Sequence, residues 1–254
     1  MLSVDVVKKI YGGVGPVQSN RLKQVIMDVY ADVDGSPTLE QVAQAYTALV
    51  PNADSVVGIL NNFVMQEIFS SSASDLKTLG ELIDGSVLVL DLRELDPDQD
   101  TKNALVALFL NQYFEYMIQL TKWPFETREN IQVRRLNSYI VVDEATNIME
   151  YDFDVLSALL LQGREYGVGV LLSSQFLSHF VPTGGPNYAE PLLTWFIHQV
   201  PNVTISDLRK IGFLGATDDD AARISNLAVH GAFYKSLNYP GKFIRGLPFF
   251  ELGK

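Results

Sequence analysis

Short, densely apolar runs separated by helical patterns are the feature that most constrains the fold of this chain. The runs SVLVLDL (86–92), 138–143 and GVGVLLSS (167–174) are rich in aliphatic and β-branched residues, which is typical of strands covered on both faces of a sheet. Helical patterns fill residues 101–121 and 151–166, between successive runs. Because apolar strands that alternate with helices form parallel sheets through right-handed crossovers, we expect an α/β fold built on a parallel sheet.

The part of the chain before the first of these runs has a different pattern. Apolar residues recur at spacings near three and four over residues 15–70, which predicts helices, one of them capped by Ser36 or Thr38. The periodicity changes where the first apolar run begins. We therefore expect a helical subdomain over residues 1–85 and an α/β core over residues 86–254.

The C-terminal third adds strands and short helices to this scheme. Segments 194–200, 229–235 and 242–246 are predicted to be further strands that close the sheet. Segments 206–213 and 218–228 are predicted to be short helices between those strands. No internal repeat is found, so we expect a single copy of this arrangement.

The composition excludes several classes of function. The formal net charge is -11, from 30 acidic residues against 19 lysines and arginines, so bulk charge does not bind this chain to nucleic acid. The absence of cysteine excludes disulfides, thiolate zinc sites and a cysteine nucleophile. The histidines, His179, His198 and His230, are too scattered for a histidine-pair metal site.

Targeting signals are not found in this sequence. The N-terminal residues lack the apolar core of a signal peptide, and no apolar run reaches the ~18 residues of a membrane helix. We therefore expect a soluble, cytoplasmic protein without a membrane partner.

Acidic and amide side chains follow two of the predicted strands at the point where each strand ends. NSYIVVDEATNI (137–148) places Asp143 and Glu144 after four strand-forming residues, and Gln175 follows GVGVLLSS. Because ligands bind beyond the carboxyl ends of parallel strands, we expect these side chains at one edge of the sheet. Nucleotide hydrolysis uses one carboxylate to hold Mg²⁺, a second to polarise water and an amide to contact the γ-phosphate. The structural alternative is a strand that ends in solvent, with its acids capping the next helix and Gln175 in a loop.

The order and spacing of these residues resemble a known family. IVVDEATNI followed by LLLQGREYGVGVLLSSQ resembles the second half of the HerA/FtsK-type motor ATPases. There, a Walker B strand ends in Asp-Glu, a helix ends in Arg-x-Tyr-Gly, and a strand ends in Ser or Thr and then Gln. Upstream, GPVQSNRLKQVIMDVY and SPTLEQVAQAY resemble the family's helical insertion, and GSVLVLDLRELDPDQDTKNALVALFLNQYFEYM resembles the unit before Walker B. The resemblance covers most of residues 12–180, and DptH-type proteins of phosphorothioation-linked DNA restriction are a similar branch.

The resemblance implies roles for four residues and two cofactors. Asp143 would hold Mg²⁺, Glu144 would activate the attacking water, and Gln175 would sense the γ-phosphate of ATP. Arg164 would reach the nucleotide of a neighbouring subunit. The implied fold is RecA-like: a parallel sheet flanked by helices, with an N-terminal helical insertion and without the first βα unit.

Two features depart from the family pattern. The phosphate-binding sequence G-x-x-x-x-G-K-[ST] occurs nowhere in the chain: YGGVGPVQSN lacks the lysine, and YPGKF has phenylalanine after it. Without that loop, we expect very weak nucleotide binding. Either Met1 stands downstream of a Walker A segment in the intact protein, or the chain never bound ATP. In addition, Trp195 stands where many relatives have the arginine of a Thr-Arg pair.

The resemblance implies part of an ATP-driven DNA translocase or helicase-like motor in DNA restriction, antiviral defence or DNA processing. Its partners would be DNA, other copies of the chain in a ring, expected to be a hexamer, and further complex subunits. This chain alone would be inactive as an ATPase. Two alternatives stay open: a non-catalytic, degenerate ATPase module in protein assembly, and a motor ATPase of type IV secretion or conjugation.

Aromatic and basic residues before the strand 138–143 also have two interpretations. Trp123 and Phe125 are predicted to be an exposed loop or a packing anchor. Arg134 and Arg135 are suited to contact DNA, but two arginines before a strand are usually solvated. The expected structure here is a loop.

Overall fold

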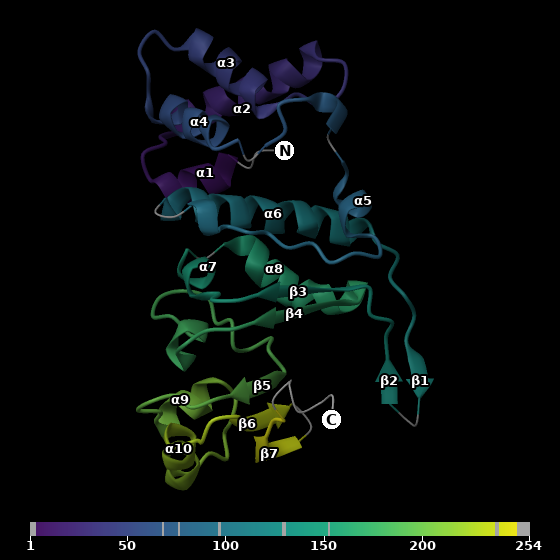
Figure 1. Cartoon of the computed structure of the whole chain (residues 1–254), viewed down its shortest axis with the longest axis vertical. Coiled ribbons are helices and arrows are strands. Elements are labelled where there is room, and N and C mark those ends of the chain that lie inside the picture. The colour runs from purple at the N-terminus through teal and green to yellow at the C-terminus, as the bar shows by residue number, and fades with distance from the viewer. Residues whose placement is uncertain are drawn as a thin grey trace. The chain divides into compact units, whose positions relative to one another are not determined.

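The computed structural model divides into two compact units, residues 1–119 and residues 120–254 (Figure 1). The structure describes residues 4–67, 69–75, 77–95, 98–128, 131–151, 153–236 and 239–247. Met1, and Asp96 and Pro97 before the expected long helix, lie outside the described residues. The domain boundary expected after residue 85 is placed at a change of sequence pattern. The division after residue 119 is one of compactness. The domain boundary after residue 85 therefore stays a prediction.

The first unit is helical, as its apolar spacing predicts. Thr38, rather than Ser36, caps the helix that follows: its hydroxyl oxygen accepts a hydrogen bond from Gln41 N at 3.3 Å, and Gln41 Oε1 accepts one from Thr38 N at 2.8 Å. This reciprocal pair satisfies two backbone amides that the start of a helix leaves free. The helices are α1 (Val4–Tyr11), α2 (Pro16–Asp32), α3 (Leu39–Leu49), α4 (Ser55–Met65), α5 (Leu79–Ile83) and α6 (Gln99–Gln119), with 3-10 turns η1 (Ala73–Asp75) and η2 (Arg93–Leu95).

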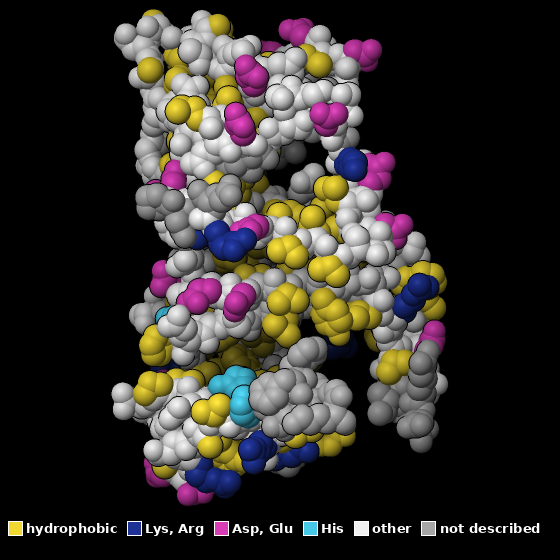
Figure 2. Space-filling model, in the orientation of Figure 1, with side chains coloured by type: hydrophobic (Ala, Val, Ile, Leu, Met, Phe, Trp, Pro, Cys, Tyr) yellow, Lys and Arg dark blue, Asp and Glu magenta, His cyan; other side chains and the backbone are white. Residues whose placement is uncertain are grey.

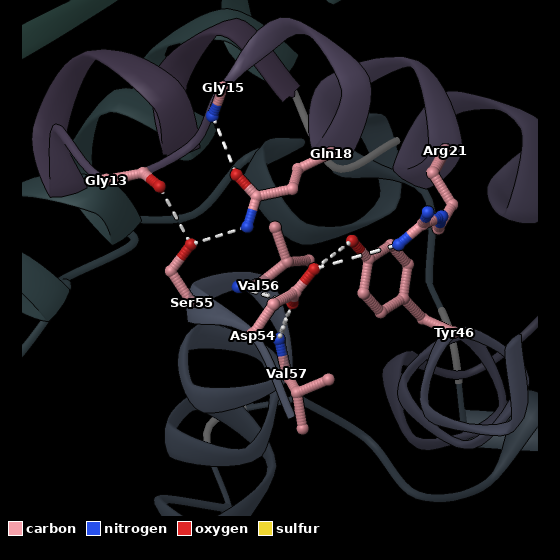
Figure 3. A network of polar contacts seen from close by, with 9 residues as sticks. All are labelled: Gly13, Gly15, Gln18, Arg21, Tyr46, Asp54, Ser55, Val56 and Val57. Atoms are coloured by element: carbon pink, nitrogen blue, oxygen red, sulfur yellow. Dashed lines mark hydrogen bonds and ion pairs between the residues drawn. The ribbon is translucent and has the colours of Figure 1, made fainter. Parts of the chain in front are cut away.

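Asp54 connects three helices of this unit (Figure 3). At the start of α4, Asp54 Oδ1 accepts hydrogen bonds from the amides of Val56 and Val57 at 3.0 and 3.1 Å. Asp54 Oδ2 accepts one from Tyr46 OH of α3 at 3.0 Å and lies 3.9 Å from Arg21 Nη1 of α2. Burial raises the pKa of the Asp54 carboxyl, but the hydrogen bonds that it accepts, that of Val57 foremost, outweigh burial and lower the pKa.

The glycine-rich segment YGGVGPVQSN begins a helix whose first turn is already capped (Figure 3). Gln18 Oε1 accepts a hydrogen bond from Gly15 N at 2.8 Å, and Gln18 Nε2 donates to Ser55 Oγ at 3.0 Å. Ser55 in turn donates to the carbonyl of Gly13 at 2.8 Å. These hydrogen bonds connect the start of α2 to the start of α4. The segment also lacks the lysine of a phosphate-binding loop.

A second polar cluster joins α1, α4 and α6. Tyr11 OH lies 2.9 Å from Thr101 Oγ1, and Asn62 Nδ2 donates to Thr101 Oγ1 at 2.9 Å and to Asp98 Oδ2 at 2.6 Å. Burial raises the pKa of Tyr11 to about 12. Burial also raises the pKa of Asp98, but hydrogen bonds from Thr101 and Asn62 outweigh it, so the pKa is lowered.

The prediction of a buried strand over residues 86–92 is wrong. No strand is assigned there, and Val87 and Val89 are 90% and 74% exposed. The β-branched residues favour an extended chain, but a strand also requires a partner for its backbone N–H and C=O groups. Sequence composition reports the first condition and not the second.

The second unit contains the parallel strand pair that the sequence predicts. Strands β3 and β4 pair in register from Ser138↔Val168 to Val142↔Leu172, with α8 in the crossover between them (Figure 1). This arrangement confirms the α/β class. The elements of this part are β3 (Ser138–Val142), α7 (Thr146–Glu150), α8 (Asp154–Gln162), the 3-10 turn η3 (Gly163–Tyr166), β4 (Val168–Leu172) and the 3-10 turn η4 (Leu177–Phe180).

The later strands do not extend this parallel pair in the described residues, contrary to expectation. They form a separate antiparallel sheet in the order β5-β6-β7, with two short helices beside it (Figure 1). Strands β6 and β7 form a hairpin, and β5 pairs antiparallel with β6 although α9 and α10 separate the two strands in sequence. Each pairing satisfies backbone N–H and C=O groups within this sheet. The elements are β5 (Thr194–Ile197), α9 (Ile205–Lys210), α10 (Asp218–Ser225), β6 (Gly231–Ser236) and β7 (Tyr239–Arg245).

The expected loop before β3 contains a hairpin instead. Strands β1 (Glu126–Arg128) and β2 (Ile131–Val133) pair antiparallel, with Glu126 opposite Val133. The prediction missed it because each strand has only three residues, too few to show an alternating pattern.

The parallel pair is covered on one face only, whereas the sequence predicted cover on both. Tyr139, Val141 and Leu171 are 65%, 66% and 53% exposed, while Ile140 is buried. Tyr139 lies over Gly169, where an added Cβ would be 2.4 Å from the tyrosine ring. The exposed apolar side chains of Tyr139, Val141 and Leu171 belong to strands. Within the described residues, no helix combines the length and apolarity needed to cross a bilayer.

Candidate functional site

The carboxyl ends of β3 and β4 lie side by side, because the strands are parallel and Val142 is opposite Leu172. The residues that follow the two strands are therefore neighbours in space although about thirty positions separate them in sequence. Four of them, Asp143, Glu144, Ser173 and Gln175, form what we call the acid–amide edge. Asp143, Glu144 and Gln175 are exposed and Ser173 is half-buried, so solvent and small molecules reach the two carboxylates and the amide.

Gln175 contacts Glu144 directly. Gln175 Nε2 donates a hydrogen bond to Glu144 Oε1 at 2.8 Å. Within the described residues, the second carboxylate oxygen of Glu144 has no hydrogen-bond partner. The arrangement leaves one oxygen for water or substrate and fixes the other against an amide.

Ser173 links the two acids, a role that the sequence analysis missed. Ser173 Oγ donates a hydrogen bond to Asp143 Oδ1 at 2.5 Å and accepts one from Glu144 N at 3.1 Å. Glu144 N also donates to Asp143 Oδ1 at 3.1 Å. The signal for Ser173 is its position directly after β4, opposite the residue that follows β3.

The backbone of Glu144 is held in an uncommon conformation. Its φ is 56°, in the left-handed region that a Cβ atom disfavours. The amide of the following residue, Ala145, donates to Ser173 O at 2.8 Å, and Ser173 N donates to Val142 O at 3.0 Å. These bonds hold the turn, and strain of this kind is concentrated at functional sites.

A second hydroxyl cluster lies beside the edge and holds the same two loops together. Ser174 Oγ lies 2.7 Å from His179 Nδ1, and Thr146 Oγ1 lies 3.0 Å from both Ser174 Oγ and His179 Nδ1. All three side chains are half-buried. Sequence reasoning treated His179 only as an isolated histidine, and no motif indicated this contact.

Arg164 lies at the opposite end of the strand pair. It belongs to η3, which precedes β4, whereas the acid–amide edge follows it. Because β4 has five residues at about 3.3 Å each, Arg164 is on the order of 15 Å from the acids along the strand. It is exposed, and no described residue forms an ion pair with it. The structure thus brings Asp143, Glu144 and Gln175 together but not Arg164.

Trp195 is a packing residue. It is 6% exposed, its ring lies edge-on to Phe180 at 5.0 Å between centroids, and its Nε1 donates to Leu192 O at 3.2 Å. Trp195 is therefore part of the core of the second unit.

The donors of the edge suit Mg²⁺ in its usual protein setting. Mg²⁺ takes oxygen ligands and is held by one or two carboxylates together with waters and substrate phosphates. Asp143 Oδ1 is oriented by Ser173, and Asp143 Oδ2 has no hydrogen-bond partner among the described residues. Among the described residues, no three or more acidic or histidine side chains are placed so that they could hold a metal ion together.

Fold and edge together define an α/β protein with a cluster of acidic and amide side chains at the ends of two parallel strands. No protein-family model matches this sequence, and no curated protein matches it. Its structure is similar to that of VirB4 of Thermoanaerobacter pseudethanolicus, with a TM-score of 0.67 over 98% of this chain and 70% of that chain. The sequence identity is 12%, so the similarity is one of fold.

Proposed function

We propose that this chain supplies the acids and the sensor amide of a nucleotide-hydrolysing motor of the FtsK, HerA and VirB4 type. The hydrogen bond between Gln175 and Glu144, at the carboxyl ends of two parallel strands, is the observation that supports it most. The similarity of fold to VirB4 supports the same class.

Glu144, Asp143 and Gln175 each have a role in that reaction. Glu144 orients the attacking water and accepts its proton as the water oxygen bonds to the γ-phosphorus. The bond between the γ-phosphorus and the bridging oxygen breaks, and ADP leaves with the electron pair. Asp143 holds Mg²⁺, which when bound stabilises phosphate charge. Gln175 contacts the γ-phosphate, and its hydrogen bond to Glu144 reports whether that phosphate is present.

The phosphates require a second component, because the chain contains no G-x-x-x-x-G-K-[ST] sequence. In the intact protein a Walker A segment upstream of these residues supplies it. Arg164, exposed at the far end of the strand pair, reaches the nucleotide of the next subunit in a ring.

DNA translocation in restriction or defence, as in HerA and DptH-type proteins, is the specific activity that we propose. Type IV secretion is the competing assignment. The similarity of fold to VirB4 supports this assignment more strongly than the sequence motifs do. If the assignment to DNA translocation is right, we expect DNA to stimulate the ATPase activity of the full-length protein.

Nucleotide titration tests the general proposal. This chain and a version extended upstream of Met1 are titrated with a fluorescent ATP analogue in the presence and absence of Mg²⁺. We expect the extended version to bind and this chain to bind at least a hundredfold more weakly. If neither version binds, the chain is a degenerate assembly module, the alternative that the missing lysine favours.

Replacing Glu144 tests the chemical role. In the extended protein, Glu144→Gln is expected to bind ATP and to lower turnover by at least a hundredfold, so that ATP stays bound. Glu150→Gln is the matched control, because Glu150 is an exposed glutamate at the end of α7 outside the edge. Unchanged turnover in Glu144→Gln would remove the assignment.

A further inference from the structure

The β1–β2 hairpin brings aromatic and arginine side chains together at its base. Glu126 and Val133 are the last pair of the two strands, and Phe125 and Arg134 are the residues next to that pair. The Arg134 guanidinium carbon lies 4.1 Å from the Phe125 ring centroid, and that of Arg135 lies 4.7 Å from the Trp123 ring centroid. We call these four residues the arginine–aromatic cluster.

The cluster is fixed to the turn before β4. Arg134 Nη1 donates to the carbonyl of Glu165 at 2.5 Å, and Trp123 Nε1 donates to Asn137 Oδ1 at 3.1 Å. Asn137 Nδ2 donates in turn to the carbonyl of Tyr166. The rings and guanidinium groups are thus ordered before any ligand arrives, which lowers the entropic cost of binding.

The surface is exposed and carries positive charge in an acidic chain. Trp123 is 38% exposed, Phe125 is 47% exposed, and Arg135 is exposed with no ion pair to a described residue. Residues 122–135 contain four basic residues against two acidic ones, although the whole chain has a formal net charge of -11. Lys122 is ion-paired with Glu165 at 2.6 Å, so Arg134 and Arg135 supply the positive charge of the cluster. Local charge therefore attracts an anionic ligand here, while the rest of the chain repels one.

Two kinds of contact are available on this surface. An arginine stacked on a ring keeps the N–H groups at its edge for phosphate oxygens. An exposed aromatic ring stacks on an unpaired base, whereas the bases of a duplex are already stacked. Phosphate-binding and base-stacking groups side by side match a single strand of nucleic acid better than a duplex.

We propose that the arginine–aromatic cluster binds single-stranded nucleic acid, with Arg135 on the phosphates and Trp123 and Phe125 on the bases. The cluster contacts the turn before β4, at the end of the strand pair away from the acid–amide edge. The proposal therefore does not rest on nucleotide hydrolysis, and either one can fail without the other. A protein partner is the competing occupant, because Trp and Arg are also enriched in protein interfaces.

Fluorescence anisotropy with a labelled 20-nucleotide oligo-dT in 50 mM NaCl tests this on the whole chain. We expect saturable binding, weaker binding of a duplex of the same length, and about a tenfold loss for Trp123→Ala or Arg135→Ala. For Arg135→Ala the slope of log K against log salt should also fall by about 0.7, the share of one phosphate contact on a single strand.

Arg223→Ala is the matched control. Arg223 also stacks on an aromatic ring, 3.7 Å from the Phe243 centroid, but it pairs with Asp219 on α10 and lies outside the cluster. Its oligo-dT affinity should not change. Because Trp195 is buried, quenching of tryptophan fluorescence by oligo-dT should come from Trp123 and vanish in Trp123→Phe.

Three results would overturn the proposal. The first is no binding of oligo-dT in 50 mM NaCl. The second is equal loss in Arg223→Ala, which would indicate only a general effect of charge. The third is concentration-dependent self-association that Arg135→Ala abolishes, which would make a second copy of the chain the occupant. Thermal unfolding of each variant separates loss of contact from loss of fold.

Discussion

The backbone amide of Glu144 lies 3.1 Å from the hydroxyl oxygen of Ser173, although the two residues follow different strands. The same hydroxyl donates to Asp143 Oδ1 at 2.5 Å, so one serine contacts the carboxylate of Asp143 and the backbone of Glu144. The parallel pairing of β3 and β4 makes this possible, because it ends both strands at the same level.

Ser173→Ala should disturb the edge more than the fold. We expect a loss of about 1 kcal/mol in the free energy of unfolding, the usual contribution of a hydrogen bond of this type. In a hydrolytically active, extended protein, turnover should also fall, and by more than the loss of stability explains, because Asp143 loses the group that orients it. Urea unfolding and steady-state turnover measure the two effects. Ser178→Ala, an exposed serine in η4, is the control and should change neither.

Glu144→Gly should stabilise the chain relative to Glu144→Ala by about 1 kcal/mol. Glycine adopts a φ near 56° without steric cost, whereas alanine keeps the Cβ that makes this conformation unfavourable. Both variants remove the carboxylate, so both should lack hydrolysis in the extended protein. Equal urea midpoints for the two variants would show that the turn relaxes to an ordinary φ.

Asp54→Ala should destabilise the first unit by about 1–2 kcal/mol. The change removes the acceptor for two amides at the start of α4 and leaves Tyr46 OH without its partner. Asp54→Asn keeps an oxygen acceptor and should recover part of the loss. Asp34→Ala, at an exposed bend between α2 and α3, is the control and should stay within about 0.5 kcal/mol of the parent.

The first unit should lose stability in acid because of Asp54 and Asp98. Hydrogen bonds lower the folded-state pKa of both carboxyls, so the unfolded state takes up protons first as the pH falls. The stabilisation is complete above the unfolded pKa of about 3.9 and is lost as the pH drops through the lower folded value. Urea midpoints measured from pH 6 to pH 2.5 should fall below about pH 4. In Asp54→Asn the fall should be smaller.

Gly167→Ala should destabilise the second unit by about 2 kcal/mol or more. Gly167 has a φ of 71°, and an added Cβ would lie 2.3 Å from the carbonyl oxygen of Arg135. Both the conformation and the close approach oppose a side chain. Gly215→Ala is the control, since its added Cβ meets nothing within 4 Å. A small effect at Gly167 would mean that the turn at Gly167 and the backbone at Arg135 move apart readily.

Local sequence identified most helices and the strands that flank the site. The helical spacing before residue 70 and the β-branched run before Asp143 reflect local conformational preferences, which do not depend on tertiary contacts. The resemblance to motor ATPases selected Asp143, Glu144 and Gln175, and the strand pairing places these three together.

The tertiary structure decided which segments pair as strands, because a strand needs a partner for its backbone hydrogen bonds. Residues 86–92 have a strand-like composition but no strand pairing, and β5, β6 and β7 pair with one another instead of extending the parallel pair. The sequence by itself determined the α/β class, most of the helices and the strands β3 and β4, because periodicity and local propensity act within a few residues. The structure decided which edges pair, that Ser173 contacts both Asp143 and Glu144, and that Arg134 stacks on Phe125. These features depend on contacts between residues distant in sequence, which no local pattern encodes.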